Sequence, residues 1–131
     1  MAINYVNFSD AVFIHLRLMQ RLGEIRFGVD NRELIESALA RPQQSANYEN
    51  ADIVRQAATL YFGLIKNHPW LGGNKRTATA LVDEFLYRNG YDIIETSISD
   101  VIKLVLDIEA DRLKVDEIES WLRKRIVKLA T

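Results

Sequence analysis

Residues 51–89 read ADIVRQAATLYFGLIKNHPWLGGNKRTATALVDEFLYRN and decide the fold, because they carry two helical hydrophobic patterns joined by one short loop. In the first pattern, apolar residues cover most of the helix circumference: Ile53, Val54, Ala57, Leu60, Tyr61, Leu64 and Ile65. So wide an apolar surface predicts a central helix, buried on several sides, over residues 51–67. The second pattern predicts a helix from about Asn74 to Asn89, where Asn89-Gly90 suits a left-handed C-cap.

Two more helices are expected before this pair. The first has Ser9 as its N-cap and ends at Gly23. The second starts at a capping box of Asp30 and Glu33, and Pro42 ends it, because the residue before a proline avoids the α region. Residues 43–50, QQSANYEN, are polar and lack a helical period, so they predict a surface loop.

Two helices are also expected after the pair. Ser97 or Ser99 can cap one of them, and the last runs from about Asp116 to Ile126. The best strand candidate, residues 91–94, is short. The basic residues near the C-terminus predict the solvated face and last turn of the final helix: Arg123, Lys124, Arg125 and Lys128. The periodicity therefore predicts an all-α fold, a compact bundle of about six helices.

Composition narrows the class of protein. With 131 residues, of which 48% are hydrophobic and 27% charged, the chain suits one globular domain over residues 1–131. A net charge of −1 gives no reason to expect direct nucleic-acid binding. The absence of cysteine excludes disulfides and thiolate metal sites. No signal sequence or apolar run of about 20 residues is present, so we expect a cytoplasmic protein without a membrane partner.

The loop HPWLGG at residues 68–73 has the composition of an anion site. Pro69 takes His68 out of the preceding helix, and Gly72-Gly73 permits a tight turn close to a ligand. Asn74 is the expected N-cap of the next helix, whose first N–H groups and dipole favour a phosphate or another anion.

Two cations follow in the first turn of that helix. Lys75 and Arg76 lie where positive charge is unfavourable by a few tenths of a kcal/mol, unless an anion offsets it. The stretch is not a Walker A loop, which needs a preceding strand and a different glycine spacing. Spacing alone favours two alternatives for His68 equally: a general base, or a cap for the carbonyls of the preceding helix.

Other polar residues are expected to be structural. His15 lies among apolar residues and predicts a satisfied, partly buried side chain rather than a metal ligand, since histidine zinc sites need three or four convergent ligands. Asp83-Glu84 is expected on the solvent side of its helix.

The residues of the loop resemble a known signature. Asn67-His68-Pro69-Trp70 followed by residues 73–78, GNKRTA, is similar to the signature of Doc (death on curing) toxins in the Fic/Doc superfamily. The likeness continues at ESALARPQQ (36–44), Ala57-Ala58, Phe85-Leu86, Asn89-Gly90-Tyr91, Trp121-Leu122 and His15.

This resemblance implies an all-helical Fic-type fold and transfer of a phosphate-containing group from a nucleotide to a protein hydroxyl. His68 would be the general base, and Trp70 would anchor the loop in the core in place of a phenylalanine. The phosphates would be held by Gly73, Asn74, Lys75 and Arg76. Residues 43–50 would correspond to the flap that clamps the target.

The group transferred follows from two positions. Proteins of the superfamily that transfer AMP have glycine where this chain has Lys75 and arginine where it has Thr79. The lysine resembles the Doc pattern, which implies a kinase that transfers the γ-phosphate of ATP with Mg²⁺ to a target of the elongation factor Tu class. The resemblance also implies neutralisation by a Phd-like antitoxin.

Gly72 departs from the signature, because it replaces the acidic residue that holds Mg²⁺ in the family. Loss of that carboxylate removes the main protein ligand of the metal. Three functions therefore stay open: a toxin-type protein kinase, a weakened or inactive homologue that still binds nucleotide or antitoxin, and a nucleotidyl (AMP) transferase.

Overall fold

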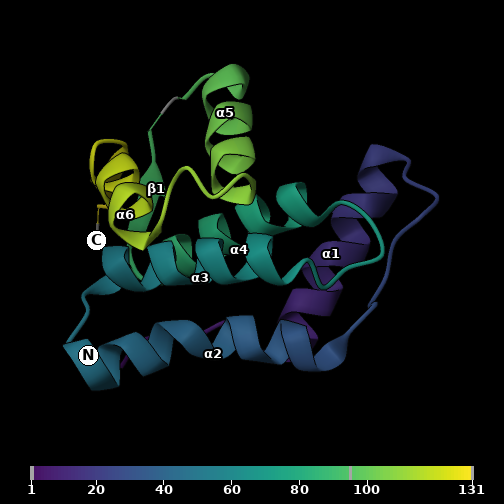
Figure 1. Cartoon of the computed structure of the whole chain (residues 1–131). Coiled ribbons are helices and arrows are strands. Elements are labelled where there is room, and N and C mark those ends of the chain that lie inside the picture. The colour runs from purple at the N-terminus through teal and green to yellow at the C-terminus, as the bar shows by residue number, and fades with distance from the viewer. Residues whose placement is uncertain (1, 95, 131) are drawn as a thin grey trace.

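The computed structural model describes residues 2–94 and 96–130 and shows a helical protein (Figure 1). The described residues form α1 (Phe8–Leu22), α2 (Arg32–Glu49), α3 (Ile53–Asn67), α4 (Asn74–Arg88), β1 (Tyr91–Ile93), α5 (Ile98–Glu109), α6 (Val115–Arg123) and β2 (Ile126–Lys128). The prediction of an all-α bundle of about six helices is confirmed. None of the described helices is both long enough and apolar enough to cross a bilayer.

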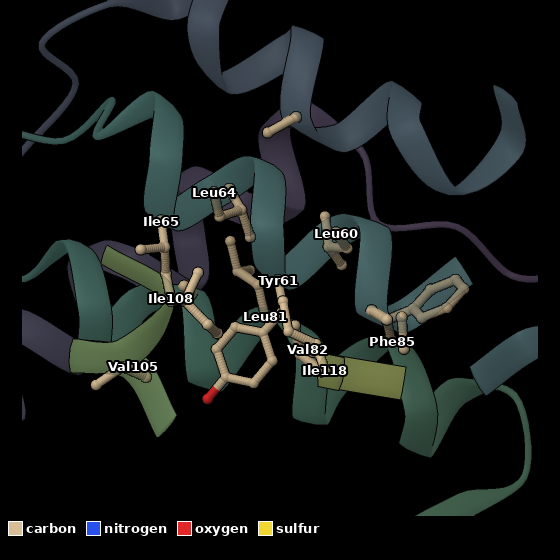
Figure 2. Close-up of a cluster of buried hydrophobic side chains, with 14 of the residues drawn as sticks. Leu60, Tyr61, Leu64, Ile65, Leu81, Val82, Phe85, Val105, Ile108 and Ile118 are labelled. Carbon is tan, nitrogen blue, oxygen red and sulfur yellow. The ribbon is translucent and has the colours of Figure 1, made fainter. Parts of the chain in front are cut away.

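The central position of α3 is also confirmed. It packs against α2 on one side and against α4, α5 and α6 on the others. Figure 2 shows its side chains Leu60, Tyr61, Leu64 and Ile65 together with buried residues of the surrounding helices, among them Leu81, Val82, Phe85, Val105, Ile108 and Ile118. Burial of each such apolar side chain contributes about 1.5–3 kcal/mol, so this shared core fixes both ends of the loop that follows α3.

The prediction that Pro42 ends the second helix is wrong, and so is the loop predicted for residues 43–50. Helix α2 continues through Pro42 to Glu49 and ends at Asn50, which takes a left-handed conformation. Pro42 is buried, and Glu49 forms an ion pair of 2.9 Å with Arg55 of α3. Packing against α3 and this final contact offset the missing proline N–H. Residues 43–49 therefore lie in a helix and do not form a flap.

The N-caps of the first two helices lie close to the predicted positions but on other residues. Asn7, and not Ser9, caps α1 by accepting from the Asp10 N–H at 2.8 Å, and Asn31, and not Asp30, caps α2. Gly23 ends α1 with φ of 70°, and Ser97 caps α5, both as predicted.

The C-terminal region differs from the prediction. Helix α6 ends at Arg123, and the chain then forms β2, which pairs antiparallel with β1 in the register Asp92 to Val127. The basic residues Arg123 to Lys128 therefore extend from the last turn of α6 into a strand. Pairing with β1 is a contact between distant segments, so the local sequence pattern did not reveal it.

Candidate functional site

The loop between α3 and α4 begins where α3 can no longer continue. His68 is the C-cap of α3 with φ of 50°, and its N–H donates to the Leu64 carbonyl at 3.3 Å. Pro69 follows and has no N–H with which to extend the helix. The imidazole of His68 is exposed and lies at the mouth of the loop.

Asn74 does not cap α4 as predicted. Gly73 is the N-cap, with φ of 66°, and supplies no side-chain cap. Asn74 is buried, and its side chain accepts from the Trp70 N–H and donates to the Trp70 carbonyl, both at 2.9 Å. The Asn74 side chain therefore holds the loop together. Because Gly73 has no side chain to cap the helix, the first-turn N–H groups of α4 have no side-chain partner from the N-cap, which favours an anion there.

The His68 side chain makes only a long contact with Asn74. Its Nδ1 lies 3.4 Å from Nδ2 of Asn74, which is longer than an ordinary N–H hydrogen bond of about 2.9–3.0 Å. The imidazole is therefore free to accept a proton from a group brought to the mouth of the loop.

The two cations of the first turn differ in their surroundings. Lys75 forms an ion pair of 3.1 Å with Glu109 at the end of α5. Arg76 is exposed and forms no ion pair within the described residues. The argument from uncompensated charge therefore applies to Arg76, whereas the charge of Lys75 is partly offset by a contact between helices.

Trp70 lies in the core with 1% of its surface exposed. It stacks on His15, with 4.1 Å between ring centroids. Its indole Nε1–H has no hydrogen-bond partner among the described residues. The aromatic ring thus holds the loop against α1, while its polar atom is left unsatisfied.

His15 is completely buried, more so than predicted, and both ring nitrogens are engaged. Nε2 accepts from the Gly28 N–H at 2.9 Å, so the proton of the neutral ring lies on Nδ1, which donates to Oγ1 of Thr77 at 2.8 Å. Burial lowers the pKa of His15 to about 4. The neutral ring therefore joins α1, α4 and the segment before α2.

That segment, residues 24–31, lies along the loop. The Leu71 N–H donates to the Gly28 carbonyl at 2.9 Å, and the Asp30 and Asn31 N–H groups donate to the Pro69 carbonyl at 3.1 Å. Arg26 adds a side-chain contact, because its Nε–H donates to the Leu71 carbonyl at 3.0 Å. Sequence reasoning missed this segment, since it has no helical period and only Gly28 hints at a close approach.

Gly72 lies against the backbone of this segment. A Cβ built on Gly72 would lie well inside 3.0 Å of the Arg26 carbonyl oxygen, closer than side chains approach in proteins. The carboxylate that would bind a metal at this position is therefore not only absent but sterically excluded by the present backbone.

Two cavities adjoin α4. An apolar groove of about 530 Å³ lies between α1, α4 and α5, and Lys75 and Arg76 form part of its wall. A second cavity of about 600 Å³ is lined by Tyr61, Asp83, Glu84 and Asp92, among others. Desolvation, and then the charge of Asp92, raises the pKa of Asp83 to about 6. Asp83 is exposed and Glu84 partly exposed, in keeping with the solvent side of the helix predicted for them.

The loop lies in the part of the chain that matches a known protein family. The model of the Fic/DOC family matches residues 5–86, which is more than half of the chain. Toxin Doc of Mycolicibacterium smegmatis is 34% identical over 96 residues, which cover 69% of this chain and 65% of that protein. The chain therefore spans slightly less than two thirds of the length of this relative. On both matches, the chain belongs to the Fic/Doc family.

Proposed function

We propose that this protein is a toxin of a toxin–antitoxin pair that transfers the γ-phosphate of ATP to a hydroxyl of a protein target. The observation that carries the proposal is the position of the exposed His68 beside the first turn of α4, which has no N-cap side chain and contains Lys75 and Arg76. Membership of a family that includes a Doc toxin supports it.

The chemistry needs a base, an anion site and a leaving group. His68 takes the proton of the target hydroxyl, whose oxygen bonds to the γ-phosphorus. The bond from that phosphorus to the β–γ bridging oxygen breaks, and ADP leaves. The uncapped N–H groups of α4 and the cations Lys75 and Arg76 stabilise the charge on the phosphates.

Thr79 favours phosphoryl over nucleotidyl transfer. Its hydroxyl donates to the Lys75 carbonyl at 3.0 Å and lies 2.6 Å from the hydroxyl of Tyr61. This side chain is engaged inside the fold, so it cannot replace the second phosphate-binding arginine of the AMP-transferring proteins.

Magnesium does not fit the loop as it does in the family. Gly72 offers no ligand, and the described residues contain no group of three or more histidine, cysteine or acidic side chains that could hold a metal. No step of the reaction is therefore assigned to Mg²⁺. The same feature supports the second candidate, a homologue that binds nucleotide or antitoxin without appreciable transfer.

The partners follow from the proposed chemistry. We expect a target of the elongation factor Tu class in the cytoplasm. A Phd-like antitoxin helix would fit the apolar groove between α1, α4 and α5, where Leu22, Ile98 and Ile102 are exposed. Because Lys75 and Arg76 line this groove, an antitoxin bound there would also cover the phosphate site.

The test is labelling of purified elongation factor Tu with γ-labelled and α-labelled ATP in parallel. Label from the γ position alone, lost in His68→Ala, supports the kinase. Label from the α position would show that the protein is a nucleotidyl transferase and not a kinase. Nucleotide binding without any labelling would establish the inactive homologue.

A further inference from the structure

Arg26 lies against Gly72, the position at which the family signature has an acidic residue. Its backbone carbonyl occupies the space of a Cβ on Gly72, and its side-chain Cγ lies 3.8 Å from the same point. Its Nε–H donates to the Leu71 carbonyl at 3.0 Å, which holds the guanidinium beside the loop. A protein cation therefore lies next to the position from which a carboxylate would hold a metal cation.

The charge of this guanidinium is not used elsewhere in the described part of the chain, where Arg26 forms no ion pair and its side chain is exposed. The single Nε contact leaves the remaining N–H donors of the guanidinium for a ligand. Phosphate oxygens match the planar donor set of arginine, often in paired hydrogen bonds.

The position of Arg26 is set by backbone contacts as well as by its own side chain. Gly28, two residues on, accepts from the Leu71 N–H at 2.9 Å and donates to the buried His15. The Asp30 N–H reaches the Pro69 carbonyl at 3.1 Å. Arg26 thus lies on a segment that is fixed against the loop, so its charge is placed there before any ligand binds.

We propose that Arg26 supplies the positive charge that a metal held at position 72 would supply, so that the loop binds nucleotide phosphates without a divalent cation. The inference rests on the proposed function, since it concerns nucleotide binding at the same loop. Arg26 and Arg76, together with Lys75 where Glu109 does not offset its charge, then neutralise part of the charge of the triphosphate.

The effect of Mg²⁺ on the affinity for ATP distinguishes a site that binds phosphates through a metal from one that binds them through protein cations. A site that binds phosphates through a metal gains affinity when Mg²⁺ is added. A site built from protein cations prefers free ATP, because Mg²⁺ neutralises the charge that the site recognises.

The experiment is calorimetric titration of the whole chain with ATP, in EDTA and in excess Mg²⁺. We expect binding in EDTA, with affinity unchanged or lowered by Mg²⁺. Arg26→Gln should weaken binding in EDTA by about tenfold or more, the usual effect of losing a charged hydrogen bond. Arg26→Lys, which keeps the charge, should recover part of the loss. Arg21→Gln removes an equal charge from the last turn of α1 and should have little effect.

Thermal unfolding of each variant confirms that it is folded. Binding that requires Mg²⁺ would overturn the inference and leave the proposed function standing. An Arg26→Gln variant that binds like the wild type would also overturn the inference. Absence of ATP binding in both conditions would overturn the inference and the proposed function together.

Discussion

Position 72 is restricted to glycine by the backbone of the segment that packs against the loop. The obstacle to a side chain is the carbonyl oxygen of Arg26, a backbone atom that cannot rotate away. We expect Gly72→Ala to lower the free energy of unfolding by about 1–3 kcal/mol, as overpacking does elsewhere. Denaturant titration measures this loss.

The double variant Arg26→Ala with Gly72→Ala is the control for this explanation. It removes the Arg26 side chain but keeps the carbonyl, so the cost of the alanine at position 72 should persist. Recovery of the lost stability in the double variant would show that the side chain, and not the backbone, was the obstacle.

Trp70 combines a well-packed ring with an unsatisfied polar atom. Trp70→Phe removes the buried Nε1–H that has no partner among the described residues, which offsets the volume lost from the core. We expect Trp70→Phe to change the free energy of unfolding by less than about 1.5 kcal/mol, and Trp70→Ala to lower it by about 3–5 kcal/mol. Equal losses in the two variants would mean that the indole N–H has a partner.

At the scale of the elements, His15 joins α1 to α4 and to the segment before α2. Its pKa is about 4 in the folded protein, against 6.5 for a histidine in water, so the unfolded chain binds the proton more strongly. The stability due to neutral His15 is therefore complete above pH 6.5 and declines as the pH falls toward 4.

The measurement compares the wild type with His15→Gln in denaturant titrations over this range. The difference in free energy of unfolding between them should shrink by about 3 kcal/mol as the pH falls. The pKa of Asp83 is raised to about 6, so Asp83 makes the free energy of unfolding change with pH in the opposite direction. Because Asp83 is present in both proteins, its contribution cancels in the difference. A difference that stays constant with pH would contradict the buried neutral imidazole.

The ion pair of Lys75 with Glu109 links α4 to α5 and offsets part of a charge that the proposed phosphate site would use. Both side chains are partly exposed, so the pair is worth at most about 1 kcal/mol. Glu109→Gln should therefore raise affinity for ATP by up to about fivefold, measured by calorimetry, with little change in stability. Asp100→Asn, an equal charge change in the first turn of α5, is the matched control and should leave affinity unchanged.

At the scale of the whole molecule, one hydrophobic cluster joins the described helices and includes Trp70 of the loop. Ile118 of α6 is fully buried in this cluster. Ile118→Ala should lower the free energy of unfolding by about 2–5 kcal/mol. Because α6 makes no part of the loop, ATP affinity should stay unchanged at a temperature where the variant is folded. A parallel loss of affinity would show that the core, and not only the local contacts, sets the loop.

The sequence by itself determined the features that depend on neighbouring residues. Helical periodicity predicted the central helix and its partners, and the contiguous residues 67–78 indicated the family. Gly23 and Ser97 act within one turn of their own helices, so their caps were predictable.

Only the tertiary structure decided the features that depend on residues far apart in sequence. Packing on α3 carries α2 past Pro42, against its local preference. The partners Arg26 and Leu71 are separated by 45 positions, and Lys75 and Glu109 by 34. Such contacts determine that position 72 is closed to a side chain, that a guanidinium lies beside the loop and that Lys75 is paired with Glu109. Local propensity carries no information about them, because they exist only once the helices have packed.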